Sequence, residues 1–180
     1  MALAAGGEAF AGRLHLKDRI LLAVYAFLFL CVSMYLGTGW SLWLFSLPVA
    51  PKLTVANYYL QLVPQVDAAT AFFTPMTKAM IAANLVMIVA EWRTKLRWLP
   101  IIVLLAVIAA TVLTVKWLFP LNVMMANGIT DQAQLQEIVG KWIYFNKWRV
   151  TLWTIQWIGM MAYFLVAWSP QYRTKVSSTG

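Results

Sequence analysis

Charged residues are scarce in this chain. Of its 180 residues, 11% are charged and 62% are hydrophobic, and the mean hydropathy is +0.73. Soluble globular proteins carry about 25% charged and roughly 45–50% apolar residues. A water-soluble fold with so few charges could not cover its surface, so most of that surface must face lipid or other protein. The sequence therefore predicts an integral membrane protein.

Residues that bind metals or form disulfides are nearly absent. The chain has one cysteine, Cys31, one histidine, His15, and six acidic residues scattered along it. A single cysteine excludes an intrachain disulfide. One histidine and one cysteine far apart cannot build a protein-ligated zinc, haem or iron–sulfur site. We therefore expect no metal and no cofactor, and a metal-dependent enzyme is disfavoured.

The basic residues are grouped rather than spread, although they give a net charge of +8. They form no stripe and accompany no nucleic-acid-binding module, so we expect no nucleic-acid partner. Clusters at residues 13–19, 93–97 and 173–175 all fall on one side if the chain crosses the bilayer four times. By the positive-inside rule, the sequence predicts a multi-pass protein of the cell inner (plasma) membrane with both termini in the cytoplasm.

Long apolar runs predict the fold class, an all-α integral membrane four-helix bundle with an additional amphipathic helix before the last span. A membrane-spanning helix needs about 20 apolar residues. We expect a cytoplasmic segment at residues 1–19, a transmembrane domain at 20–168 and a cytoplasmic tail at 169–180. The expected spans are residues 20–47, 71–90, 99–119 and 150–168.

Prolines and glycines set the expected helix limits. Residues 48–70 are expected to form a polar and aromatic connection, with Pro75 in the first turn of the second span, where proline is tolerated. Pro120 is expected to stop the third span. The first span is overlong and is expected to tilt or bend near Gly37 and Gly39. Residues 131–149 predict an amphipathic helix that lies at the interface or extends the last span out of the membrane.

Polar side chains inside the spans predict which faces turn inward, because hydrocarbon offers them no partner. Asn146, Arg149, Trp153 and Gln156 follow at i, i+3, i+7 and i+10, a single stripe if the helix is continuous. Asn84 lies in the middle of the second span. Two interpretations stay open for such residues, since they either join helices, at about 0.6 kcal/mol each, or form a ligand site.

Charged and aromatic residues predict the character of the outer end. A polar, partly charged mouth suits an amphipathic ligand and equally an ordinary interface with water. Tryptophans are expected mostly as interfacial belts. The residues expected at the mouth are Asp67, Lys78, Lys116, Glu137 and Arg149, and those of the belts are Trp92, Trp98 and Trp168 on the inner side and Trp117, Trp142 and Trp148 on the outer side.

Three stretches carry a resemblance to a known family: residues 45–53 (FSLPVAPKL), 119–122 (FPLN) and 142–149 (WIYFNKWR). With them, residues 20–168 resemble the anthrone-oxygenase-like family of small four-helix membrane proteins. The resemblance implies oxidation of polycyclic aromatic anthrones to quinones without an evident metal. The family often has histidine in place of Asn146, and asparagine cannot act as a general base near neutral pH. The matching Asn122 and Arg149 are then expected to bind the ligand's oxygen groups or to hold the mouth of the bundle together.

Two functions stay open. One is an enzyme or binding protein for an apolar, oxygen-bearing small molecule, with ligand-binding residues Asn122, Asn146, Arg149, Trp153, Gln156 and Asn84. The other is a structural or accessory subunit of a larger membrane complex, such as a respiratory or photosynthetic one, which the many tryptophans and the all-round apolar third helix favour. A transporter or channel is less favoured, because no buried acid or charge pair supplies a coupling site.

Overall fold

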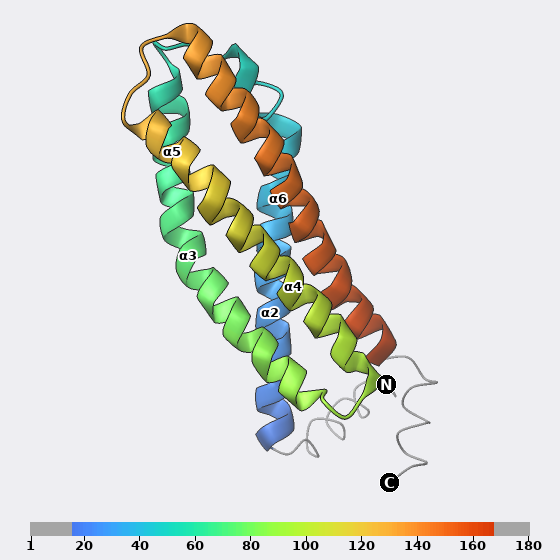
Figure 1. Ribbon diagram of the computed structural model, residues 1–180. Helices are drawn as coiled ribbons and strands as arrows, with labels where there is room; N and C mark the ends of the chain where they lie inside the picture. The colour runs from blue at the N-terminus through green and yellow to red at the C-terminus, as the bar shows by residue number, and fades with distance from the viewer. Residues whose placement is uncertain (1–15, 168–180) are drawn as a thin grey trace, which may run out of the picture.

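The computed structural model describes residues 16–167, and these form four long helices joined by short connections (Figure 1). Four helical stretches are each long and apolar enough to cross a membrane: Leu16–Ser46, Tyr58–Ala90, Lys95–Ala126 and Gln132–Ala167. The predicted all-α four-helix fold is confirmed, and the chain is a multi-pass membrane protein whose surroundings include the lipid bilayer.

In chain order the elements are α2 (Leu16–Ser41), the π-helix η1 (Leu42–Ser46), the 3₁₀-helix η2 (Ala50–Lys52), α3 (Tyr58–Ala90), the 3₁₀-helix η3 (Lys95–Arg97), α4 (Trp98–Leu113), the π-helix η4 (Thr114–Leu118), α5 (Phe119–Ala126) and α6 (Gln132–Ala167).

The bundle runs up and down in chain order, as short connections between antiparallel neighbours require. Helix α2 packs on α3, α3 on α4 and α4 on α6, and α6 packs back on α2 to close the ring. Figure 1 shows the start of α2 and the end of α6 at the same end of the bundle as the turn between α3 and α4. We call this the terminal end, and the opposite end, with the other two connections, the loop end.

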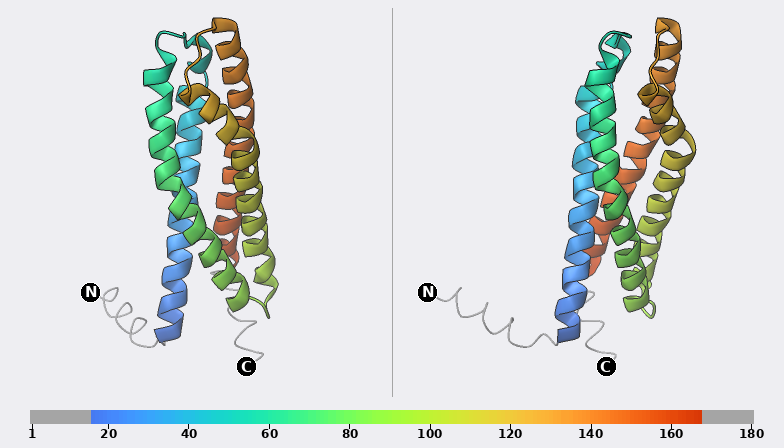
Figure 2. Two further views of the ribbon diagram at one scale, coloured as in Figure 1. Left: turned by 60° about the vertical axis from the view of Figure 1, so that its left-hand side comes forward. Right: turned by 90° about the vertical axis from the view of Figure 1, so that its left-hand side faces the viewer.

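Helix α3 is longer than the sequence predicted, since it begins at Tyr58 and has 33 residues. Residues 58–70 are therefore helical, and the expected connection there was wrong. Pro64 and Pro75 both lie inside this helix, so the placement of Pro75 in a first turn was also wrong. Each proline removes one backbone hydrogen bond and loosens the helix. Figure 2 shows that α3 changes direction along its length instead of ending.

The third long helix continues past Pro120 to Ala126, so the expected stop at this proline was wrong. The π-helix η4 precedes it, and the Phe119 N–H there bonds to the Thr114 carbonyl, five residues back. This changes the hydrogen-bond register immediately before Pro120, which then occupies the first turn of α5. A proline is tolerated in a first turn, because the N–H that it lacks has no partner there anyway.

Helix α2 stays regular through its glycines, and the irregular part is η1, which begins after them. Gly39 has no side chain, which allows α6 to pack closely against α2 at this position. A Cβ atom at this position would lie 2.7 Å from Cε3 of Trp153, whereas one at Gly37 would meet nothing within 4 Å. The expected bend at the glycines is thus replaced by a π-helical segment and a close contact between two helices.

Helix α6 is continuous over 36 residues. At about 1.5 Å per residue it is roughly 54 Å long, which exceeds the ~30 Å hydrocarbon thickness. The amphipathic segment at 131–149 is therefore an extension of the last span, one of the two expected alternatives. Because the helix is continuous, the polar residues of this segment and those of the span form one stripe.

Two buried apolar clusters fill the bundle, one toward each end. The terminal-end cluster includes Leu28, Val32, Met80, Met87, Val103 and Met160. The loop-end cluster includes Leu47, Tyr58, Leu118, Met125, Leu135 and Val139. The outward faces of the helices carry many exposed apolar side chains, as contact with lipid requires.

Candidate functional site

A cavity of about 860 Å³ lies within the loop-end half of the bundle, between the two apolar clusters. Its walls come from the second half of α2, the first two thirds of α3, the junction of α4 with α5, and the middle of α6. Pockets for small molecules usually measure about 300–1,000 Å³. The cavity is therefore large enough for a ligand of several rings.

Aromatic rings form the side of the cavity nearest the terminal-end cluster. The ring of Tyr35 lies 4.6 Å from that of Phe73 and 4.8 Å from that of Trp153, between centroids. The Tyr35 hydroxyl shares a 2.6 Å hydrogen bond with Thr77 and donates to the Phe73 carbonyl. We call Tyr35, Phe73 and Trp153 the aromatic floor. These packed rings form an apolar wall against which a flat apolar molecule can lie.

Arg149 is a charged residue of the cavity wall, and it lies inside the bundle. Its Nη2 donates to Oδ1 of Asn146 at 2.5 Å, and Asn146 in turn donates to the Trp142 carbonyl at 2.8 Å. The guanidinium carbon lies 4.7 Å from the ring centroid of Trp153, within reach of a cation–π interaction. The Nε atom of Arg149 is buried and has no hydrogen-bond partner.

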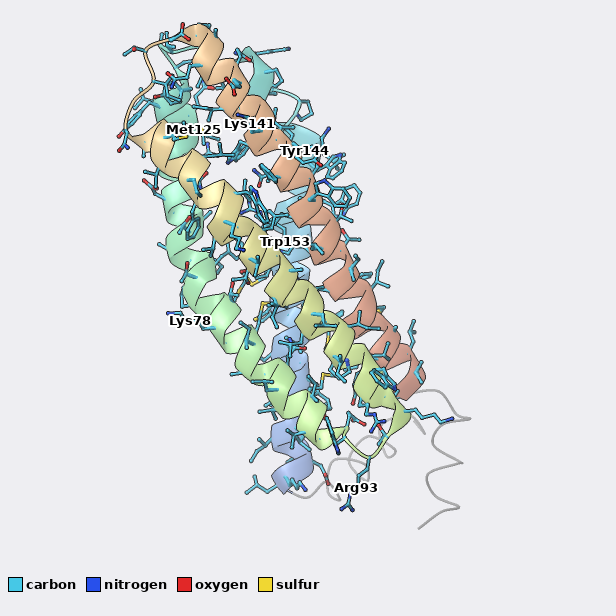
Figure 3. All side chains as sticks on the ribbon, in the orientation of Figure 1. Lys78, Arg93, Met125, Lys141, Tyr144 and Trp153 are labelled. Atoms are coloured by element: carbon cyan, nitrogen blue, oxygen red, sulfur yellow. The ribbon has the colours of Figure 1, made fainter. Side chains whose placement is uncertain are left out.

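Most of the charged residues that were expected at the mouth of the bundle do not line this cavity. Of the five, Arg149 and Lys78 line it, and Asp67, Lys116 and Glu137 do not. Glu137 pairs with Lys141 instead. Lys78 is exposed and extends from the outer flank of α3 (Figure 3), so it belongs to the rim.

The threonines of the wall are turned toward their own helices. Four of the six hydroxyls donate to the carbonyl four residues back, those of Thr74, Thr77, Thr111 and Thr114. The oxygens of Thr74, Thr111 and Thr114 can still accept a hydrogen bond, whereas that of Thr77 is bonded to the Tyr35 hydroxyl. Gln156, which is 1% exposed, lines the same wall, and its Oε1 has no partner. The wall thus offers acceptors as well as the Arg149 donors.

The structure brings together four of the six candidate ligand residues. Asn122, Arg149, Trp153 and Gln156 all line the cavity. Asn146 lies behind Arg149 and holds it, without lining the cavity itself. Asn84 is fully buried away from the cavity, where its side chain donates to the Met80 carbonyl and its Oδ1 has no partner.

Several lining residues were missed, among them Tyr35 and Phe73 of the floor and Gln61 and Gln65 on α3. A signal for the glutamines existed, because they are four residues apart and so share one face of a helix. It was read as a polar connection instead. Nothing in the sequence marked Tyr35, whose position depends on how α2 packs against α3.

Trp142 is 4% exposed, and its Nε1 donates to Oδ1 of Asn122 at 3.1 Å. Its expected place in the outer aromatic belt was therefore wrong, whereas Trp117 and Trp148 are exposed as a belt requires. The indole N–H found a buried partner, as buried tryptophans usually do. This hydrogen bond joins α6 to α5 at the loop end of the cavity.

Replacing Trp142 with phenylalanine is expected to lower the free energy of unfolding, because the Asn122 amide loses its donor. A double-mutant cycle with Asn122→Leu, measured by unfolding in detergent, should give a coupling of about 0.5–1.5 kcal/mol. Trp148→Phe is the matched control, since Trp148 is 54% exposed. A coupling near zero between Trp142 and Asn122 would contradict the role assigned to this bond.

Exposed side chains among the lining residues show where the cavity opens. They include Ser41 at the end of α2, Phe45 in η1, and Gln61 and Gln65 near the start of α3. Phe45 is 70% exposed. The opening is thus lateral, between two helices, and an apolar molecule could reach it from the lipid.

No family model, curated protein or solved structure matches this chain. Within residues 16–167, no three histidine, cysteine, aspartate or glutamate side chains come together to hold a metal ion. The chemistry of the site must therefore be read from the cavity and the side chains around it.

Proposed function

We propose that this protein binds an apolar small molecule with an oxygen-bearing polar end in the cavity. The observation that carries the proposal is the cavity itself, with an aromatic floor on one side and the donors of Arg149 beside it. The apolar body would stack on the floor, and the polar end would accept hydrogen bonds from Arg149. Asn122 lies toward the loop end of the cavity, where it is bonded to Trp142, and Gln156 lies two helical turns beyond Arg149 on α6.

The family resemblance adds a reaction to this proposal. An anthrone is flat and apolar, carries one ketone oxygen and fits the shape and polarity of the cavity. Its oxidation by dioxygen converts the ring CH₂ group to a second ketone and releases one water. Because Asn146 lacks the basicity of histidine, we propose binding as the primary activity and oxidation as a second one.

The test compares two phenylalanine substitutions at neighbouring positions of α3. Ala69 lines the cavity, whereas Ala68 is exposed and does not. Ala69→Phe should weaken binding of a fluorescent anthracene probe about tenfold or more, because the phenyl ring takes up space that the probe needs. Binding is measured by energy transfer from the tryptophans in nanodiscs. Ala68→Phe should bind as the unchanged protein does.

Two results would decide against parts of this proposal. Equal probe binding by the Ala69→Phe and Ala68→Phe proteins would place the ligand elsewhere or exclude it. In the reaction arm, anthrone is supplied in air and quinone is followed by absorbance. Quinone that forms no faster with the unchanged protein than with Ala69→Phe would leave a binding protein without catalysis.

We also propose that the terminal end faces the cytoplasm. The described part of this end carries Lys17, Arg19, Arg93, Lys95 and Arg97, which is the charge bias of a cytoplasmic side. The cavity then lies in the half of the bundle farther from the cytoplasm. A ligand would reach it from the outer leaflet of the membrane.

A further inference from the structure

The charges around the cavity are of one sign. Among the described residues that line it, Arg149 and Lys78 are basic and none is aspartate or glutamate. Lys78 is exposed at the rim, where water or lipid head groups can surround its ammonium. Arg149 lies inside the bundle, so its charge depends on what the cavity contains.

The protein supplies hydrogen-bond partners for only some of the Arg149 donors. A guanidinium has five N–H donors, and the described residues supply one acceptor, Asn146 Oδ1, and one ring face, Trp153. No carboxylate of the described residues forms an ion pair with it. A cation within a membrane-spanning helix is costly unless it is paired, and such residues commonly mark ligand pathways.

We infer that the polar end of the ligand is an anion, so that the cavity takes a flat amphiphile with a carboxylate-type head on Arg149 and its apolar body on the aromatic floor. This inference rests on the proposed function and adds the charge of the ligand. An anionic head would supply acceptors for the remaining Arg149 donors through charge-assisted hydrogen bonds, which are stronger than neutral ones. The Trp153 ring fixes the guanidinium in place before the ligand arrives.

The lateral opening fits such a molecule. An amphiphile in a leaflet keeps its head near the interface and its body among the lipid chains. The exposed glutamines Gln61 and Gln65 and the hydroxyl of Ser41 give the opening a polar edge, and Phe45 gives it an apolar one.

The experiment compares an anthracene carboxylate with its methyl ester, which has the same rings but no charge. Both affinities are measured in nanodiscs of zwitterionic phosphatidylcholine and corrected for partition into empty nanodiscs. The unchanged protein should bind the acid about 10- to 100-fold more tightly than the ester, the range expected for hydrogen bonds to charged groups. Arg149→Met should abolish this ratio, and Arg149→Lys should retain part of it.

A cation outside the cavity provides the matched control. Lys116 is exposed in η4 and does not line the cavity. Lys116→Met removes one positive charge from a membrane-spanning stretch and should leave the ratio of acid to ester unchanged. A ratio that falls equally in Lys116→Met and Arg149→Met would show a general effect of net charge and overturn the assignment to Arg149.

Failure of this inference is distinct from failure of the proposed function. Equal affinities for acid and ester in the unchanged protein would overturn the anionic head and leave the binding function standing. Absence of binding for both ligands would overturn both. A ratio that survives in Arg149→Met would place the anion at another group.

A further arm identifies the source of the anion. Phosphatidylglycerol is added to the nanodiscs, with equal phosphatidylcholine as its control. Competition with the anthracene acid in the unchanged protein, but not in Arg149→Met, would support an anionic lipid head group as the occupant. An unchanged affinity would support a free organic acid.

Discussion

Gly39→Leu is expected to destabilise the bundle strongly and to abolish ligand binding, while Gly37→Leu changes neither. A Cβ atom at Gly39 would lie 2.7 Å from Cε3 of Trp153 and 3.3 Å from Cγ1 of Val150. Both neighbours are buried, so they have little room to move. Overpacking of this kind costs about 1–3 kcal/mol or more. Because Trp153 belongs to the aromatic floor, any adjustment also reshapes the cavity.

The control at Gly37 makes the comparison specific. This residue lies on the same helix, and a Cβ atom there meets nothing within 4 Å. Removing a glycine from a helix interior is itself favourable by about 0.5–1 kcal/mol, so Gly37→Leu should be at least as stable as the unchanged protein. Thermal unfolding in detergent gives the stabilities, and the anthracene probe gives the binding. Similar unfolding temperatures for the two variants would contradict the close approach of α2 to α6.

A second-site change separates the contact with Trp153 from a general effect of leucine at this depth. Trp153→Ala alone removes the floor and should lower stability by about 3–5 kcal/mol. Combined with Gly39→Leu, it leaves space for the leucine side chain. The double variant should therefore lose less stability than the sum of the two single variants. Strict additivity would show that the leucine and the indole do not meet.

The four helices could be predicted from the sequence because lipid imposes a simple pattern on long apolar runs. The helix limits could not be predicted to the same degree. Pro75 and Pro120 were read as signals of a helix start and a helix stop, but both lie within continuous helical stretches. At Pro120 a π-helical turn absorbs the missing hydrogen bond, and no residue pattern marked that turn in advance.

The site could be predicted only where it depends on one helix. The stripe of Asn146, Arg149, Trp153 and Gln156 follows from helical geometry, and α6 is continuous. All of these except Asn146 line the cavity. Tyr35 faces them from another helix. Its position depends on the register between helices, which arises from contacts such as that between Gly39 and Trp153. Single-helix periodicity contains no information about such a register.

Replacing Arg149 and Asn146 together is expected to stabilise the ligand-free protein. Asn146 is fully buried, and its Oδ1 has Arg149 as its donor. Buried polar groups that form hydrogen bonds mainly with each other can often be replaced as a set by apolar residues, with a gain of about 1–4 kcal/mol. Asn146→Leu with Arg149→Met makes this exchange. Arg149→Met alone should be less stable than the double variant, because it leaves the Asn146 oxygen buried without a donor, at a cost of about 1–3 kcal/mol.

The ligand offsets this difference in stability if Arg149 is retained for binding. A ligand at 100 times its Kd adds about 2.7 kcal/mol to the stability of a protein that binds it. With the anthracene acid present, the unchanged protein should gain this amount and the double variant should gain almost none. Unfolding measured with and without the acid gives both quantities in one experiment. A double variant that is less stable than the unchanged protein without ligand would show that Arg149 holds the bundle together, and that its position in the cavity wall reflects structure rather than binding.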